Sequence, residues 1–127
     1  MSGTRRLCVG LGVAGIVAVT LALVSGDGSA HALLLESAPE HETVAPAPER
    51  IVLRFNGRIE KRLSRVVVAG GTPGRAITLE APEPSGPDTL VYPLPPLGPG
   101  PWEARWRVLS VDGHFTEGKV RFTVSEP

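Results

Sequence analysis

Apolar and polar residues alternate in short runs along the chain from about residue 33 onward. In residues 50–55, for example, Ile51, Leu53 and Phe55 share one face, which is the pattern of a strand with one buried side. Residues 102–108 alternate more strictly, with a charged side chain at every second position. The same reasoning predicts seven strands, at residues 33–36, 50–55, 63–69, 75–81, 88–94, 102–108 and 119–124.

Glycine and proline separate these runs. The chain has 15 Gly and 13 Pro among its 127 residues, and they gather between the predicted strands, as tight turns require. After residue 30, no stretch of ten residues has helical periodicity free of Pro and Gly. Short strands separated by such turns predict an all-β fold, a two-sheet sandwich of immunoglobulin-like form with about seven strands.

The first thirty residues have a different character. Arg5 and Arg6 precede an uninterrupted apolar run over residues 7–24, and small residues follow it. Basic, apolar and small-residue regions in this order are typical of a secretory signal peptide. We therefore expect residues 1–30 to be a signal peptide and residues 31–127 to form the mature domain. The protein would then be exported to the periplasm or to the extracytoplasmic face of the cell membrane.

Two alternatives concern the end of this segment. Cleavage after Ala32 instead of Ala30 would also satisfy the small-residue rule and would remove His31. The apolar run has 18 residues, near the lower limit for a membrane span, so an uncleaved segment would anchor the domain in the membrane. No other contact with a membrane is predicted.

Removal of residues 1–30 would also remove all sulfur from the chain. The single Cys, Cys8, and the single Met, Met1, both lie in this segment. The mature domain could therefore form no disulfide and would offer no soft ligand for Cu(I). The whole chain has 13 Lys and Arg against 13 Asp and Glu, and this balance argues against a nucleic-acid partner held by a basic surplus.

Two histidines and one carboxylate provide the most specific chemistry in the sequence. With cleavage after Ala30, His31 would be the first residue, and its α-amino nitrogen and ring Nδ1 could chelate one ion. In Asp112-Gly113-His114, residues i and i+2 point the same way in an extended or tight-turn backbone, so a carboxylate oxygen and an imidazole could meet. This sulfur-free donor set suits Cu(II). An ordinary turn without metal is the simpler alternative.

The remaining candidates indicate structure rather than chemistry. His41 lies between two glutamates in a proline-bounded loop and is expected to be solvated. Trp102 and Trp106 lie on a predicted inward face and are expected in the core. Ser64 and Ser110 have no recognisable motif around them, and the sequence has no nucleophile elbow, phosphate-binding loop or catalytic Cys. No catalytic residue is predicted.

Four ordered segments of the sequence resemble the CopC family of exported copper-resistance proteins. They are His31-Ala32-x-Leu34-x-x-Ser37-x-Pro39, Pro48-x-x-Ile51-x-Leu53-x-Phe55, Trp106-x-Val108-x-Ser110-x-Asp112-x-His114 and Gly118-x-Val120-x-Phe122-x-Val124. The resemblance implies a Greek-key β-sandwich that binds one Cu(II) per chain outside the cytoplasmic membrane. The implied ligands are His31, through its amine and its ring, together with Asp112 and His114. A CopD-type membrane copper-import protein is the implied partner.

The chain departs from the family pattern at two places. Some members place a Glu just after the strand that here ends at Phe55, where this chain has Gly57. Some members also carry a Met-rich Cu(I) site in mid-chain, where this chain has no Met. The resemblance therefore implies a protein that binds Cu(II) only.

Three functional hypotheses follow, and the first is the expected one. It is a non-enzymatic Cu(II) carrier or scavenger that serves copper homeostasis or resistance. The second is a copper-dependent monooxygenase-like protein, since polysaccharide-oxidising enzymes also use an N-terminal His; here Asp112 would fill the copper plane and disfavour oxygen chemistry. The third is a metal-free structural or adhesion sandwich, which predicts that His31→Ala and His114→Ala change no property of the protein.

Overall fold

The computed structural model describes residue 3, residues 32–71 and residues 73–127. His31 and all but one residue of the predicted signal peptide lie outside the described residues, and the predicted domain boundary stays a prediction. The described chain is all-β, as predicted, with one short 3-10 helix, η1 (Lys61–Leu63). Its strands are β1 (Leu34–Ala38), β2 (Thr43–Ala45), β3 (Arg50–Phe55), β4 (Arg65–Gly70), β5 (Arg75–Leu79), β6 (Thr89–Pro93), β7 (Gly100–Leu109) and β8 (Phe115–Val124).

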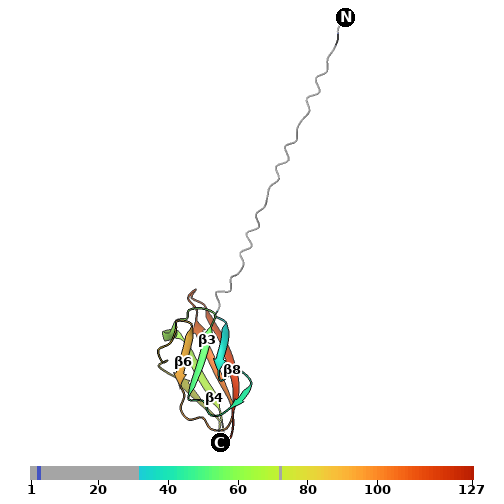
Figure 1. Cartoon of the computed structure of the whole chain (residues 1–127). Helices are drawn as coiled ribbons and strands as arrows, with labels where there is room; N and C mark the ends of the chain where they lie inside the picture. The colour runs from blue at the N-terminus through green and yellow to red at the C-terminus, as the bar shows by residue number, and fades with distance from the viewer. Residues whose placement is uncertain (1–2, 4–31, 72) are drawn as a thin grey trace.

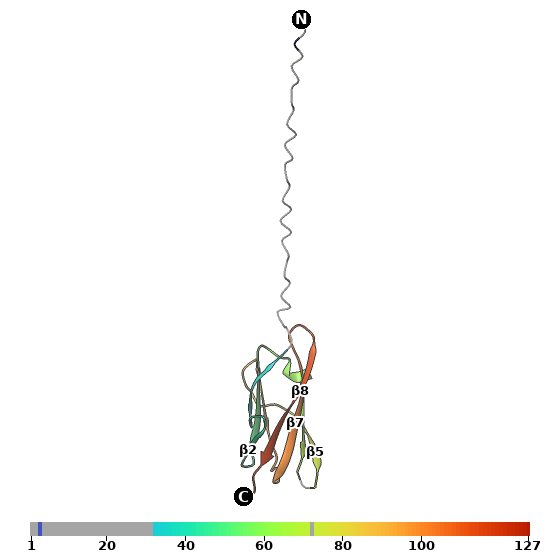
Figure 2. The same ribbon diagram turned by 90° about the vertical axis from the view of Figure 1, so that its right-hand side faces the viewer.

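The strands form two sheets that pack against each other as a sandwich (Figures 1 and 2). One sheet has three strands in the order β1-β3-β6, and the other has five in the order β2-β8-β7-β4-β5. The chain crosses between the sheets five times, after β1, β2, β3, β5 and β6, and it stays within the five-stranded sheet only from β4 to β5 and from β7 to β8. The longest pairing is the antiparallel β7–β8 hairpin, whose register runs from Gly100↔Val124 to Leu109↔Phe115. The predicted immunoglobulin-like sandwich is confirmed.

Alternation in the sequence decided which side chains fill the space between the sheets. Ile51, Leu53 and Phe55 of β3 are buried, and so are the alternate residues of β4, β7 and β8. Burial of such side chains contributes roughly 25 cal/mol for each Å² of apolar surface removed from water. The core therefore extends as one cluster through both sheets.

Trp102 and Trp106 lie in this core, as predicted, and are 2% and 7% exposed. The Trp106 ring meets Phe55 edge to face, with ring centroids 5.1 Å apart. It also covers Gly118, its partner in the β7–β8 register. A Cβ at Gly118 would lie 2.3 Å from the indole, so a side chain there would displace Trp106.

The sequence prediction missed one strand and misplaced the ends of others. β2 falls in a segment predicted to be a loop, because it has three residues and pairs parallel to β8 as an edge strand, with its exposed Val44 contributing no alternation. The strand predicted at residues 63–69 begins at Arg65, after η1. β8 begins at Phe115 and not at residue 119. The prediction missed its first residues because Gly118, at an inward position opposite Trp106, interrupts the alternation of apolar residues.

No helix in residues 32–71 and 73–127 is long and apolar enough to cross a bilayer.

Candidate metal centre

The turn between β7 and β8, residues 110–114, carries two of the three predicted ligands. The turn is closed by its own backbone, since the Ser110 N–H donates to the carbonyl of His114 and the Gly113 N–H donates to the carbonyl of Ser110, both at 3.0 Å. Gly113 has φ +85°, a conformation that glycine adopts without steric cost. The sequence Asp-Gly-His thus forms a tight turn with Asp112 and His114 on either side of the glycine.

Asp112 and His114 meet in this turn. The Asp112 Oδ2 lies 2.9 Å from the His114 Nδ1, and the His114 N–H donates to Asp112 Oδ1 at 3.2 Å. Both side chains reach solvent, with exposed fractions of 25% for Asp112 and 65% for His114. A carboxylate and an imidazole are therefore adjacent at the surface, where an ion could reach both.

Ser110 holds the carboxylate in place and is the residue that sequence reasoning passed over. It is 3% exposed, and its hydroxyl donates to Asp112 Oδ1 while lying 3.0 Å from the His114 carbonyl oxygen. The hydrogen bond from Ser110, followed by those from His114, lowers the pKa of Asp112 to about 2, although partial burial opposes the shift. Alternation along β7 could have identified Ser110, because it continues the inward positions of Trp106 and Val108.

The turn is joined to the core through the segment that follows β3. Ser110 forms an isolated bridge with Ile59, and the Glu60 N–H donates to the Leu109 carbonyl at 2.9 Å. Trp106 lies two inward positions before Ser110 along β7 and packs against Phe55. Because Ser110 and the inward residues of β7 are buried, the turn is fixed to the core at its β7 side.

The first described residues of the domain lie at the same end of the sandwich as this turn (Figures 1 and 2). Ala32 is buried. The Leu33 N–H donates to Asn56 Oδ1, and the Asn56 N–H donates to the Leu33 carbonyl, both at 2.9 Å. These contacts hold residue 32 at this end. His31, the third predicted ligand, lies outside the described residues.

Within the described ranges, no three side chains of the types His, Cys, Asp and Glu come together in a way that could hold a metal. Position 57, just after β3, is an exposed glycine and therefore supplies no further carboxylate. The space around it is open, since a Cβ there would contact nothing within 4 Å. The described chain therefore supplies two adjacent donors, one carboxylate and one imidazole. That pair fits Cu(II), which accepts nitrogen and oxygen ligands, but it needs additional donors for tight binding.

His41 has a structural role that its loop position did not suggest. Its Nδ1 accepts a hydrogen bond from the Arg121 N–H of β8 at 3.0 Å, and its Nε2 lies 3.4 Å from Glu42 Oε1. The ring is 46% exposed, so it is partly solvated, as predicted. It ties the loop before β2 to the five-stranded sheet.

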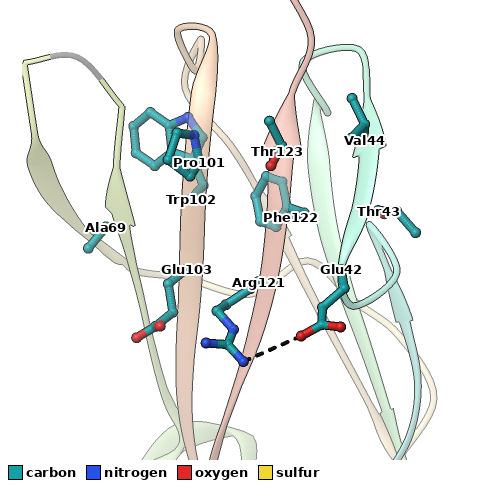
Figure 3. A pocket seen from close by; sticks show the side chains of 10 residues that line it. All are labelled: Glu42, Thr43, Val44, Ala69, Pro101, Trp102, Glu103, Arg121, Phe122 and Thr123. Atoms are coloured by element: carbon teal, nitrogen blue, oxygen red, sulfur yellow. Dashed lines mark hydrogen bonds and ion pairs between the residues drawn. The ribbon is translucent and has the colours of Figure 1, made fainter.

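A groove of about 430 Å³ crosses the outer face of the five-stranded sheet, toward the end away from the turn (Figure 3). Its charged side chains are Glu42, Glu103 and Arg121, and Arg121 reaches Glu42 at 3.4 Å. No histidine lines it. The groove therefore has neither the donors nor the location of the predicted metal site.

Comparison with known proteins gives one consistent result. Residues 34–125 match the model of the CopC domain. The chain is 28% identical to copper resistance protein C of Xanthomonas campestris pv. juglandis over 86% of its own length and 91% of the relative's. CopC from Methylosinus trichosporium OB3b has a similar structure, with a TM-score of 0.65 and 30% identity over 75% of this chain and 94% of that one. PcoC of Escherichia coli, a methionine-rich copper resistance protein, has a similar structure with a TM-score of 0.64. It is 28% identical to this chain, and the match covers 75% of this chain and 99% of PcoC.

Proposed function

The chain belongs to the CopC domain family, and from this membership we propose that it is an exported Cu(II)-binding protein that sequesters or carries copper. A copper-related function follows from the family, whose members are copper-binding and copper-resistance proteins. The further specification, one Cu(II) per chain bound without catalysis, rests on this chain's own residues.

The observation that carries the proposal is the pair Asp112 and His114, with 2.9 Å between Oδ2 and Nδ1 on a turn supported by the core. Ser110 orients the Asp112 carboxylate and favours its ionised form, so the turn offers a charged oxygen beside an imidazole before any ion arrives. Pre-oriented ligands bind more tightly because less side-chain freedom is lost on binding.

His31 is the proposed third ligand, through its α-amino group and its ring. Supporting this assignment, its neighbour Ala32 is buried, and Leu33 exchanges hydrogen bonds with Asn56 in the segment after β3 that also bridges Ser110 through Ile59. The role requires cleavage after Ala30, so that residues 1–30 act as a signal peptide and residues 31–127 form the mature protein in the periplasm or on the extracytoplasmic face. The amine and imidazoles would bind copper after losing their protons.

The choice of Cu(II) over Cu(I) rests on the absence of sulfur in residues 31–127, since the only Met and the only Cys precede them in the sequence. Nitrogen and oxygen donors favour Cu(II), whereas thioethers favour Cu(I). The chain differs here from methionine-rich PcoC. We propose a CopD-type membrane protein as the recipient of the carried ion.

The proposal is tested by competition titration of Cu(II) against a strong chelator, on protein whose intact mass shows that it begins at His31. We expect one equivalent to be held tightly, with a nitrogen-rich tetragonal electron paramagnetic resonance signal. A variant with one Gly added before His31 should bind far more weakly, because its chelating amine has become an amide.

A variant with one Gly added after Pro127 is the matched control and should bind like the unmodified protein. Equal binding by both extended variants would eliminate the N-terminal chelate. Weak or multiple binding by the unmodified protein would eliminate the copper site altogether.

A further inference from the structure

The outer face of the five-stranded sheet has a charge distribution that the fold does not require. The whole chain is neutral, yet four cations and one carboxylate line a second groove of about 430 Å³ on this face, near the candidate metal turn. They are Arg65, Arg105, Arg107, Lys119 and Glu117. We call these four cations the basic stripe. At the other end of the same face, by contrast, Glu42 and Glu103 accompany Arg121 (Figure 3).

Strand register places like charges side by side in the basic stripe. Arg65 is opposite Arg107, and Arg105 is opposite Lys119. Like charges directly opposite each other on paired strands destabilise a sheet. Arg105 and Arg107 have carboxylate partners at 2.6 and 3.3 Å, whereas Arg65 and Lys119 form no ion pair with any described residue. The stripe thus retains surplus positive charge that could act on another molecule.

The basic stripe ends in exposed apolar residues at the candidate metal turn. Phe115, the first residue of β8, is 45% exposed, and the Arg107 guanidinium lies 4.0 Å from the centre of its ring. Val111 in the turn is 63% exposed. Leu33 and Leu63 are also exposed near this end. Exposed apolar residues at the edge of a charged patch are typical of an interaction surface.

We propose that the basic stripe and the apolar tip, Val111 and Phe115, dock the domain on a bilayer that contains anionic phospholipids. Cations contact lipid phosphates while apolar side chains enter the headgroup region, and the two contributions together hold peripheral proteins to membranes. Complementary charge selects an anionic surface over a neutral one. The contact adds to any made by residues 1–30, and it does not depend on the proposed copper role.

This orientation has a consequence for the candidate metal centre. Asp112 and His114 lie in the sequence between the two apolar tip residues, so a docked domain would present them toward the membrane surface. An ion carried there would be close to a recipient embedded in the bilayer.

The test is co-sedimentation of the metal-free protein beginning at His31 with phosphatidylcholine vesicles that contain or lack phosphatidylglycerol. We expect binding to the anionic vesicles only, weakened by salt. Arg65→Gln with Lys119→Gln should weaken partitioning about 30-fold, because each cation near an anionic surface contributes roughly fivefold. The tip variant Val111→Ser with Phe115→Ser should also reduce binding.

The matched control is Arg50→Gln with Arg54→Gln, which changes the net charge equally on the outward side of β3, in the three-stranded sheet. It should bind nearly as well as the unmodified protein, and circular dichroism should show all variants to be folded. Equal losses in the stripe and control variants would overturn the proposal, as would binding to neutral vesicles or to neither. Binding to poly-glutamate with none to anionic vesicles would also overturn it, in favour of an acidic protein partner.

Discussion

His41 and His114 both lie beside an acidic residue in an exposed segment, but the partners of their rings differ. His41 Nδ1 accepts the backbone N–H of Arg121 in β8, and its Nε2 faces Glu42. His114 Nδ1 meets the Asp112 carboxylate, which Ser110 holds in turn. One ring is bonded to the backbone of a sheet, and the other is bonded to a side chain that can itself bind a metal.

The difference separates a structural histidine from a candidate ligand. An ion at the Nδ1 of His41 would have to displace a hydrogen bond that joins the loop to β8, and it would leave the Arg121 N–H without that acceptor. An ion at Asp112 and His114 would replace the contact between the Asp112 carboxylate and the His114 Nδ1, two groups that both favour metals. A histidine beside a carboxylate is therefore not enough to indicate a metal site. What decides its role is the further group in contact with the pair, which is the Arg121 N–H at His41 and the Ser110 hydroxyl at Asp112.

The largest expected effect is on copper affinity. His114→Ala should weaken Cu(II) binding more than about 100-fold, because loss of a direct ligand exceeds the roughly 10- to 100-fold cost of losing an outer partner. His41→Ala, the matched control, should leave the affinity unchanged. Competition titrations of both variants make the comparison, and equal losses would show that neither histidine is a specific ligand.

Ser110→Ala tests whether orientation of the carboxylate matters. The variant keeps Asp112 and His114 but removes the hydrogen bond that the buried hydroxyl donates to the carboxylate. We expect Cu(II) affinity to fall about 10- to 100-fold, as for other outer partners of metal ligands. Ser64→Ala serves as the control, because the Ser64 hydroxyl donates to the Glu60 carbonyl and not to a proposed ligand. An unchanged affinity in Ser110→Ala would mean that the turn backbone alone orients the ligands.

Folding stability should rank the two histidines in the opposite order. His41→Ala removes the acceptor of the Arg121 N–H and should lower the free energy of unfolding by about 0.5–1.5 kcal/mol. His114→Ala leaves the backbone hydrogen bonds of the turn in place and should have a smaller effect. Urea denaturation of the metal-free variants measures both, and a larger loss in His114→Ala would contradict the structural role given to His41.

The smallest expected effect is a pH dependence in the metal-free protein. The hydrogen bond from Ser110 is the largest cause that lowers the pKa of Asp112 to about 2. A carboxyl whose pKa is lower in the folded state stabilises the fold above its unfolded pKa, roughly 3.9, and loses that contribution as the pH falls toward 2. The stability difference between the unmodified protein and Ser110→Ala should therefore shrink between about pH 5 and pH 2. A difference that stays constant over this range would show that the hydroxyl does not act through the charge of Asp112.

Sequence patterns predicted the strands whose inner faces are buried, because burial on one side imposes alternation on residues such as those of β3 and β7. They failed at β2, whose three residues pair through backbone groups that any side chain allows. They also failed at the start of β8, where Gly118 takes an inward position because Trp106 fills its space. Alternation along β7 could have placed Ser110 on the inward face, but its role was missed because that role depends on its contact with Asp112.

By itself, the sequence determined the all-β class, the inward faces of the main strands, the family, and the residue types Asp and His at positions 112 and 114. These properties follow from local periodicity and from short spacings along the chain. Only the tertiary structure decided that Ser110 orients Asp112, that His41 bonds β8, and that Arg65 and Lys119 stand beside other cations on one face. Ser110 and Asp112 are only two residues apart, but their contact depends on the turn that places the buried Ser110 hydroxyl against the carboxylate. The contact of His41 with β8 and the neighbouring cations depend on segments far apart in the chain, and their pairing is set by how the two sheets bury their common core.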